Sequence, residues 1–276
     1  MKEAQFDLHA AIEEKHWWFL GRREIVRRIV ESLPPETAAW PVVDIGCGTG
    51  ANIASFAKGR RGIGIDSSPE AIQRASARFP QIRFLCERPQ EAIRRLDREP
   101  AVFLLMDVIE HVEDDFMFLS ELLALMEPGS RLVITTPANP ALWSEHDVSF
   151  GHYRRYTPPR LRMIWEGLPV SVELFSHFNT YLYPVATAFR FMSRIRKRPS
   201  GKAGTDFWVP ARPVNLLLKT VMASEAGFLL RRLRKGTGDG FRFGVSLIAV
   251  LKRNEGSVPV RAKPAGLPPD PHNPRK

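Results

Sequence analysis

One nine-residue stretch, Val42–Gly50, combines an acidic residue with three alternating glycines and could bind a nucleoside-containing ligand. Its apolar beginning predicts a buried parallel strand, and the glycines after Asp44 predict the turn that leaves the carboxyl end of that strand. Glycine adopts positive φ angles and lets a ligand approach the backbone without meeting a Cβ. Residues 51–58 are compatible with a helix, so the turn would aim the N–H groups of a helix start at a polar ligand.

A second predicted strand ends in Asp66, 22 positions after Asp44. An acid at this place suits the two hydroxyls of a ribose. The glycines leave two ligand classes open, because Gly46, Gly48 and Ala51 also fit the permissive G-x-G-x-x-A pattern of dinucleotide-binding proteins. Asp44 favours a ligand with a cationic end instead, since a carboxylate would repel a pyrophosphate. A glycine turn without any ligand is the structural alternative.

The two acids, the glycines and a third motif, Asp107–His111 at the end of a fourth predicted strand, together resemble class I S-adenosylmethionine-dependent methyltransferases. The resemblance is strong over residues 40–136 and weak over 170–251, and it favours the bacterial small-molecule branch that includes ubiquinone-biosynthesis methyltransferases. It implies S-adenosylmethionine as the cofactor and a doubly wound, Rossmann-like α/β sheet of seven strands with an antiparallel last strand. The cofactor-binding residues that it implies are Asp44, Gly46, Gly48, Gly50, Asp66, Glu87 and Asp107.

The chain departs from the resembled family after the third predicted strand, residues 82–86. In that family an acid following this strand usually holds the adenine amino group. Here Arg88 occupies the expected place in the simplest register, and Glu87 lies one position early. Glu87 is therefore the candidate for the adenine contact, although the sequence does not match the family pattern at this point.

Alternating strand-like and helix-like segments up to residue 136 predict a parallel sheet with ligands at the carboxyl ends of its strands. A helical region over residues 3–32, broken or kinked around Gly21, precedes them, and Pro34 ends it. The predicted division of the chain is 1–36, an N-terminal helical cap; 37–177, the cofactor-binding core; 178–241, a basic helical insertion; 242–253, the last core strand; and 254–276, a disordered tail.

Composition places the chain among globular proteins of a reducing compartment. The 276 residues suffice for a full core. The only two cysteines, Cys47 and Cys86, do not suggest a disulfide framework, so a cytoplasmic setting is expected. Residues 1–18 carry several acids and no apolar core of a secretory signal, and no apolar run approaches the roughly 18 residues that a membrane-spanning helix needs.

The net charge of +10 is concentrated late in the chain. Residues 178–241 contain 12 basic and 3 acidic residues, which gives +9, whereas residues 1–177 contain 21 basic and 25 acidic residues. Two segments of this region, 181–198 and 214–235, run from apolar to basic, which suits helices at an anionic membrane surface. A solvated basic face, or packing on the core or a second subunit, is the alternative. No nucleic-acid-binding motif is present, so no specific nucleic-acid partner is expected.

Two histidines and one aromatic loop are the candidates for the acceptor step. Methyl transfer to a hydroxyl needs a proton acceptor, and His111 and His146 are suited to that task near neutral pH. Lone histidines are more often structural. The candidates for contact with a small-molecule, glycan or lipid-linked acceptor are Trp17, Tyr153, Arg154 and Tyr156.

Other functions are left open by the same residues. Asp107, Glu110 and His111 resemble a divalent-metal site of ubiquinone-biosynthesis and small-RNA methyltransferases, but the aspartate is one methylene short, and a metal is not favoured. A short-chain NAD-dependent dehydrogenase would need a Tyr-x-x-x-Lys pair, which the four tyrosines do not supply. A non-catalytic module that binds the cofactor and docks on a membrane, with the protein peripheral at the inner face, is the remaining alternative.

Overall fold

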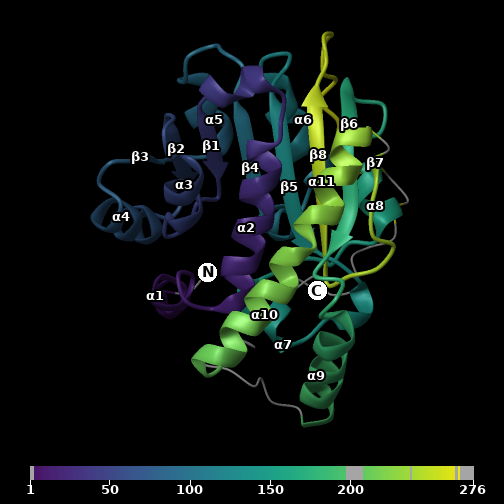
Figure 1. The fold of residues 1–276 in the computed structure, drawn as a ribbon. Coiled ribbons are helices and arrows are strands. Elements are labelled where there is room, and N and C mark those ends of the chain that lie inside the picture. Colours follow the sequence, from purple (N-terminus) through teal and green to yellow (C-terminus); the bar gives the residue numbers. More distant parts are fainter. Residues whose placement is uncertain (1–2, 197–207, 237, 265–266, 268–276) are drawn as a thin grey trace.

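In the part of the chain that the structure describes, eight strands form one sheet in the order β3-β2-β1-β4-β5-β8-β6-β7 (Figure 1). The structure is a computed structural model that describes residues 3–196, 208–236, 238–264 and 267. The strand bounds are β1 Val42–Ile45, β2 Gly62–Asp66, β3 Arg83–Cys86, β4 Val102–Met106, β5 Arg131–Pro137, β6 Val170–Phe178, β7 Gly238–Asp239 and β8 Ser246–Arg253.

Strands β1 to β5 run parallel, and β8 lies antiparallel between β5 and β6. This arrangement confirms the predicted doubly wound sheet with an antiparallel last strand. The structure adds β7, a strand of two residues that pairs with β6 at the sheet edge. Two residues are too short for a period-two hydrophobic pattern, so the sequence does not predict this strand.

Helices cover both faces of the sheet. The helix bounds are α1 Glu3–Ile12, α2 Trp17–Glu31, η1 Pro35–Ala39, α3 Ala51–Phe56, α4 Pro69–Arg78, α5 Pro89–Arg94, η2 Ile109–His111, α6 Asp115–Leu125, η3 Pro140–Leu142, α7 Glu145–Phe150, α8 Pro158–Met163, α9 Tyr183–Arg196, α10 Arg212–Ser224 and α11 Ala226–Lys235. Buried side chains of α2, α3, α10 and α11 form the core on one face, and those of α5, α6 and α8 form it on the other. Strands that are apolar throughout, such as the fully buried β4, are thereby covered on both faces.

The N-terminal helical region breaks at residues 13–16, not around Gly21 as the sequence suggests. His16 starts the second helix, because its imidazole Nδ1 accepts a hydrogen bond from the Trp18 N–H at 3.2 Å. Gly21 lies inside α2, where a Cβ would come within 2.8 Å of the Met222 sulfur on α10. The glycine therefore allows two helices to cross closely instead of bending one of them.

The described residues of the region 178–241 form three helices where the sequence predicts two. Helices α10 and α11 separate at Glu225, whose buried carboxylate accepts the backbone N–H groups of Thr180 and Tyr181 at 2.7 and 2.8 Å. Helices α1, α7, α9 and α10 gather below the carboxyl ends of the parallel strands in Figure 1. Part of the predicted basic end of α9, residues 197–198, lies outside the described residues.

Residues 254–264 also differ from the expected disordered tail. The backbone N–H groups of Arg261 and Lys263 donate to Ser120 and Asp114, and the Arg261 guanidinium lies 5.4 Å from the ring centre of Phe116. These contacts with α6 and its N-cap residue Asp114 are made by backbone N–H groups and a guanidinium, so the low apolar content of the segment gives no signal of them. Residues 265–266 and 268–276 lie outside the described part.

The close crossing of α2 and α10 predicts a loss of stability when Gly21 is replaced. Gly21→Ala is expected to lower the free energy of unfolding by about 1–2 kcal/mol, because its Cβ overlaps buried Met222. Gly227→Ala in α11 is the matched control. A Cβ there meets nothing within 4 Å, so the free energy should stay constant or rise by up to about 1 kcal/mol. Urea denaturation measures both, and a Gly21→Ala protein as stable as wild type would contradict the crossing.

Candidate functional site

A cavity of about 700 Å³ opens at the carboxyl edge of the sheet. The loop after β1, the ends of β2 and β4 and the loop around α7 contribute to its walls, and residues of α1, α2, α9 and α10 complete them. One side of the lining is polar and lies at the glycines, and much of the remainder is aromatic or aliphatic. Parallel sheets bind ligands at this edge, so the cavity is the candidate site.

The glycine loop has the conformation that the sequence predicts. Gly46, Gly48 and Gly50 have φ angles of +70°, +53° and +89°, a region that favours glycine. A Cβ on Gly46 would lie 2.5 Å from the Val108 side chain, whereas a Cβ on Gly48 would meet nothing within 4 Å. Gly46 and Gly48 line the cavity, and Gly50 instead starts α3 against Phe84.

The two strand-end acids have different positions. Asp66 lines the cavity, and its carboxylate accepts the backbone N–H groups of Gly48 and Ser68, each at 2.9 Å. Asp44 is buried beneath the loop and does not line the cavity. Burial raises the pKa of Asp44 to about 7, although Arg22 opposes the shift. Among the described residues, Asp66 is thus placed for direct ligand contact and Asp44 for an indirect electrostatic effect.

Glu87 does not contact the cavity. Its partly buried carboxylate binds the exposed Arg95 guanidinium at 2.7 Å. Asp66, Pro89, Val108 and Phe118 are among the residues that line the cavity. Because Glu87 does not line the cavity, the geometry does not support its expected contact with adenine.

Asp107 lines the cavity beside a buried arginine. It has a φ angle of +56° and forms an ion pair with Arg22 of α2, which lies 4.5 Å above the Trp18 ring. Burial lowers the pKa of Arg22 to about 10, which leaves its guanidinium charged at neutral pH. Arg22 was not among the site residues predicted from the sequence. The sequence feature that could have identified it is its spacing: Arg22 follows Trp18 by four positions, so both lie on the same face of a helix.

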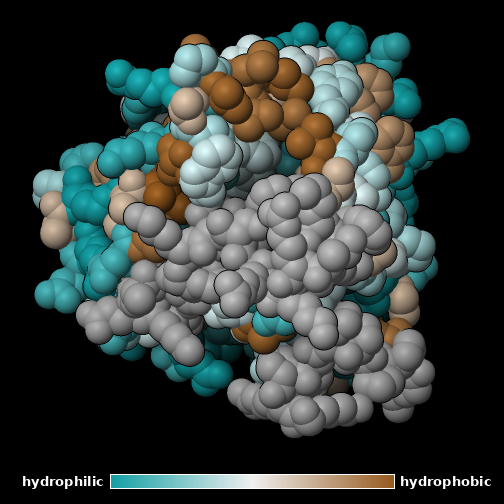
Figure 2. Space-filling view, turned by 90° about the horizontal axis from the view of Figure 1, so that it is seen from below, coloured by the Kyte–Doolittle hydropathy of each residue, from teal (hydrophilic) through white to brown (hydrophobic). Residues whose placement is uncertain are grey.

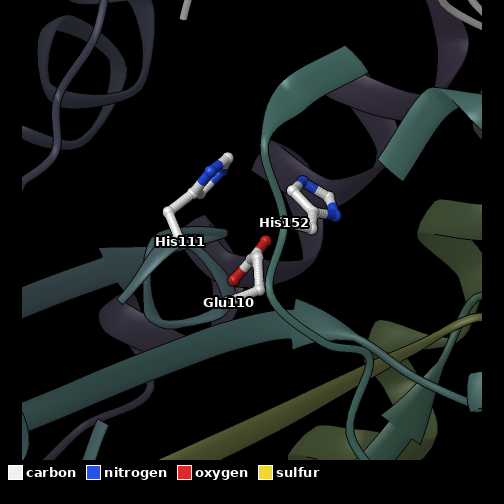
Figure 3. A group of neighbouring side chains, drawn as sticks. All are labelled: Glu110, His111 and His152. Carbon is white, nitrogen blue, oxygen red and sulfur yellow. The ribbon is translucent and has the colours of Figure 1, made fainter. Parts of the chain in front are cut away.

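Glu110, His111 and His152 surround one space in the cavity wall (Figure 3). Glu110 and His111 belong to η2 after β4, and His152 follows α7. One carboxylate oxygen of Glu110 accepts from the Thr136 hydroxyl at 3.1 Å, and the other has no hydrogen-bond partner among the described residues. Burial raises the pKa of Glu110 to about 8 and lowers the pKa of both histidines, so the imidazoles are neutral at pH 7.

These three side chains have the chemistry of a divalent-cation site. Their ligand atoms all lie within 4.8 Å of one another, and the unpaired Glu110 oxygen is available to a cation. The resemblance suggested Asp107, Glu110 and His111. The structure replaces Asp107 with His152, because the Asp107 carboxylate binds Arg22. Candidate acceptor contacts were predicted in the loop that contains His152, but His152 was not one of them: they were Tyr153, Arg154 and Tyr156.

The remaining candidates separate into two groups. Trp17 and His146 line the cavity, and the His146 ring lies 6.4 Å from that of His152. Tyr153, Arg154 and Tyr156 do not line it. Arg154 and Tyr156 bind buried Asp115 at 3.2 and 2.7 Å, so they fix the loop to α6, and their predicted contact with the acceptor is not supported.

Comparisons with known proteins agree with this geometry. A family model described as a methyltransferase domain matches residues 18–184. The chain is 34% identical over 102 residues to a ubiquinone biosynthesis O-methyltransferase of Rhodopseudomonas palustris, covering 36% of this chain and 40% of that protein. It is 28% identical over 171 residues to a demethylmenaquinone methyltransferase of Tropheryma whipplei, covering 59% and 64%. The chain therefore spans less than two thirds of the length of each of these relatives.

Solved structures share the fold at low sequence identity. A complex of the Haloferax volcanii Trm112 methyltransferase activator with a methyltransferase has a TM-score of 0.54 at 16% identity, covering 92% of this chain and 98% of that chain. The plantazolicin methyltransferase BamL, bound to S-adenosylhomocysteine, has a TM-score of 0.51 at 16% identity, covering 85% and 86%. These likenesses show the fold alone. Together with the family match, they place the chain among the class I S-adenosylmethionine-dependent methyltransferases, with S-adenosylmethionine as its cofactor.

Proposed function

We propose that the chain transfers the methyl group of S-adenosylmethionine to a hydroxyl oxygen of an amphiphilic small-molecule, glycan or lipid-linked acceptor. The observation that carries this proposal is the group of Glu110, His111 and His152 in the cavity that also contains the glycine loop. A hydroxyl must lose its proton as it attacks, and this group offers two neutral imidazoles and a carboxyl group that ionises above its pKa of about 8.

The polar side of the cavity supports a specific orientation of the cofactor. The Asp66 carboxylate would accept the ribose hydroxyls, and the open face of Gly48 would lie against the cofactor. Asp107 would face the ammonium of the methionine end, and Arg22 would face its carboxylate. This orientation directs the methyl group toward η2, where the acceptor would bind.

The protein's main task in this reaction is alignment, because the sulfonium already activates the methyl group. The acceptor oxygen must lie opposite the sulfur for in-line displacement. Glu110 and His111 are placed to take its proton, and His146 lies farther along the same wall. A divalent cation on Glu110, His111 and His152 would lower the pKa of the acceptor hydroxyl.

Apolar side chains support an amphiphilic acceptor. Those that line the cavity away from the glycines are Phe6, Trp17, Phe19, Phe150, Leu182, Val185, Trp208 and Leu218. The relative in Rhodopseudomonas palustris is named for ubiquinone biosynthesis. An acceptor with a polar head at Glu110 and an apolar remainder along α9 and α10 would match both ends of the cavity.

The surface around α9 and α10 supports docking on an anionic membrane. Exposed apolar side chains occur there beside basic ones, and hydrophobic patches are visible from this side in Figure 2. The exposed apolar residues are Val185, Trp208, Val209, Val214, Leu216 and Leu217. None of the described helices is long and apolar enough to cross a bilayer, so the contact would be peripheral. Packing against a second subunit would use the same surface.

Replacement of Asp66 tests the cofactor orientation. Asp66→Ala should weaken binding of S-adenosylhomocysteine by about 10- to 150-fold, because a charged acceptor worth about 1.5–3 kcal/mol is lost. Glu87→Ala is the control, since Glu87 binds Arg95 outside the cavity, and its affinity should match wild type. Isothermal calorimetry measures both. Unchanged affinity in Asp66→Ala, or a larger loss in Glu87→Ala, would reject this orientation.

Replacement of the proton-accepting groups tests the acceptor step. Glu110→Gln and His111→Gln should each lower turnover by about 10²- to 10⁴-fold while the affinity for S-adenosylhomocysteine stays near wild type. Because the carboxyl group of Glu110 is protonated below its pKa of about 8, turnover should rise with pH up to about 8 if Glu110 is the base.

Activity measurements with a chelator distinguish the two roles of this group. Loss of turnover in a chelator and recovery with Mg²⁺ or Mn²⁺ would identify a metal site, and the rise of turnover would then move to lower pH. Indifference to the chelator would leave a protein base. Full turnover in Glu110→Gln, His111→Gln and His146→Gln would exclude all three residues from the acceptor step.

Liposome flotation tests the membrane proposal. Binding to vesicles with anionic lipids should weaken with salt and should fall when Leu216 and Leu217 are changed to Ser. Val260→Ser removes a comparably exposed apolar side chain from residues 254–264 and should leave flotation unchanged. If the folded wild-type protein does not float at low salt, the surface is not a membrane contact, and light scattering would then test for a dimer.

A further inference from the structure

Asp147 in α7 is a buried carboxylate that contacts the imidazole of His152. Its side chain has 0% exposure, and the Oδ1 atom lies 3.0 Å from the His152 Nδ1 atom. The Arg155 guanidinium lies 2.8 Å from the same oxygen. Asp147 does not line the cavity, whereas His152 does. The carboxylate is therefore placed to act through the histidine and not on a ligand.

The second carboxylate oxygen of Asp147 connects this contact to α9. Its Oδ2 atom accepts the backbone N–H of Ser144 at 2.9 Å in a capping box, and it lies 3.3 Å from the Arg190 Nη1 atom. The same nitrogen of Arg190 donates to the Leu142 carbonyl at 2.7 Å. Arg190 thus fixes a turn of α9 to the segment that carries Asp147.

The charge state of Asp147 determines which nitrogen of His152 carries a proton. The Arg155 guanidinium, 2.8 Å from Oδ1, and the Arg190 guanidinium, 3.3 Å from Oδ2, stabilise the ionised form of this buried carboxylate. An ionised carboxylate only accepts hydrogen bonds, so Nδ1 of His152 must donate. The Nε2 atom then keeps its lone pair. The ring stands edge to face with His111, with the ring centres 4.6 Å apart.

Helix α9 is also a wall of the acceptor part of the cavity. Val185 and Ala186 line it, and the Tyr183 hydroxyl accepts the side-chain N–H of Asn139 at 2.8 Å near the start of the helix. An acceptor that enters along α9 must pass the helix that Arg190 anchors. The carboxylate of Asp147 thus contacts both His152 and Arg190 of α9.

We propose that Asp147 is a positioning residue that holds His152 with its Nε2 lone pair toward Glu110 and His111, and that Arg190 makes this positioning depend on the docking of α9. The proposal rests on the proposed function for the role of His152 in the acceptor step. The positioning itself is a property of the protein without cofactor or acceptor. When α9 is docked, His152 would face Glu110 and His111. When α9 is displaced, the His152 ring would lose this fixed orientation.

Long-range ¹H–¹⁵N spectra of histidine-labelled full-length protein test the proposal. His152→Gln assigns the signals of His152, which in wild type should be those of a neutral imidazole with the proton on Nδ1. Arg190→Gln should give a mixture of the two tautomers, because the anchored carboxylate loses one of its cations. Arg190→Lys restores a charge and should return the spectrum toward wild type. Asp147→Asn should also give a mixture.

A surface ion pair supplies the matched control. Arg162→Gln removes an arginine that binds Asp239 at 2.9 Å outside the cavity, and it should leave the His152 signals unchanged. A wild-type His152 protonated on Nε2 would overturn the role of Asp147, and a wild-type spectrum in Arg190→Gln would overturn the link to α9. Circular dichroism of Arg190→Gln verifies its fold. The spectra need no methyl transfer. They therefore test the positioning of His152 even if the proposed methyltransferase function is wrong.

Discussion

The structure depends on how negative charge is balanced at the carboxyl edge of the sheet. Strands β1, β2 and β4 deliver Asp44, Asp66, Asp107 and Glu110 to one region, and burial raises the pKa of Asp44 and Glu110. Arg22 of α2 binds Asp107 and lies near Asp44, so α2 supplies a compensating cation. A cofactor with a sulfonium and an ammonium would add positive charge where the protein has an excess of acids.

Two buried aspartates with basic partners also hold the loop after β5 in place. Asp115 gathers Arg154, Arg160 and Tyr156 away from the cavity and ties the loop to α6. Asp147 does the equivalent on the cavity side, through His152. Each aspartate is completely buried and carries more than one basic partner, which is the condition under which a buried charge is tolerated. The loop is therefore rigid enough to hold side chains at a site.

Local pattern was sufficient for the sheet and the glycine loop. Apolar strands such as β4 and the positive φ of Gly46 and Gly48 depend mainly on nearby sequence, and both were predicted. Contacts between distant segments were not predictable. Gly21 was assigned to a bend because its packing against Met222 of α10 cannot be read from the local sequence. Tyr153, Arg154 and Tyr156 were chosen as acceptor contacts because the local sequence does not show that Asp115 holds Arg154 and Tyr156. His152 needed the fold to bring it to Glu110.

The most direct test of the account is the transfer of an isotope-labelled methyl group. The protein would be incubated with S-adenosylmethionine carrying a deuterated methyl group and with lipid and aqueous extracts of bacteria, and the products would be analysed by mass spectrometry. We expect a deuterated methyl group on an oxygen of an amphiphilic compound in the lipid extract. Binding of S-adenosylhomocysteine with no labelled product from either extract would contradict it and would leave a cofactor-binding module.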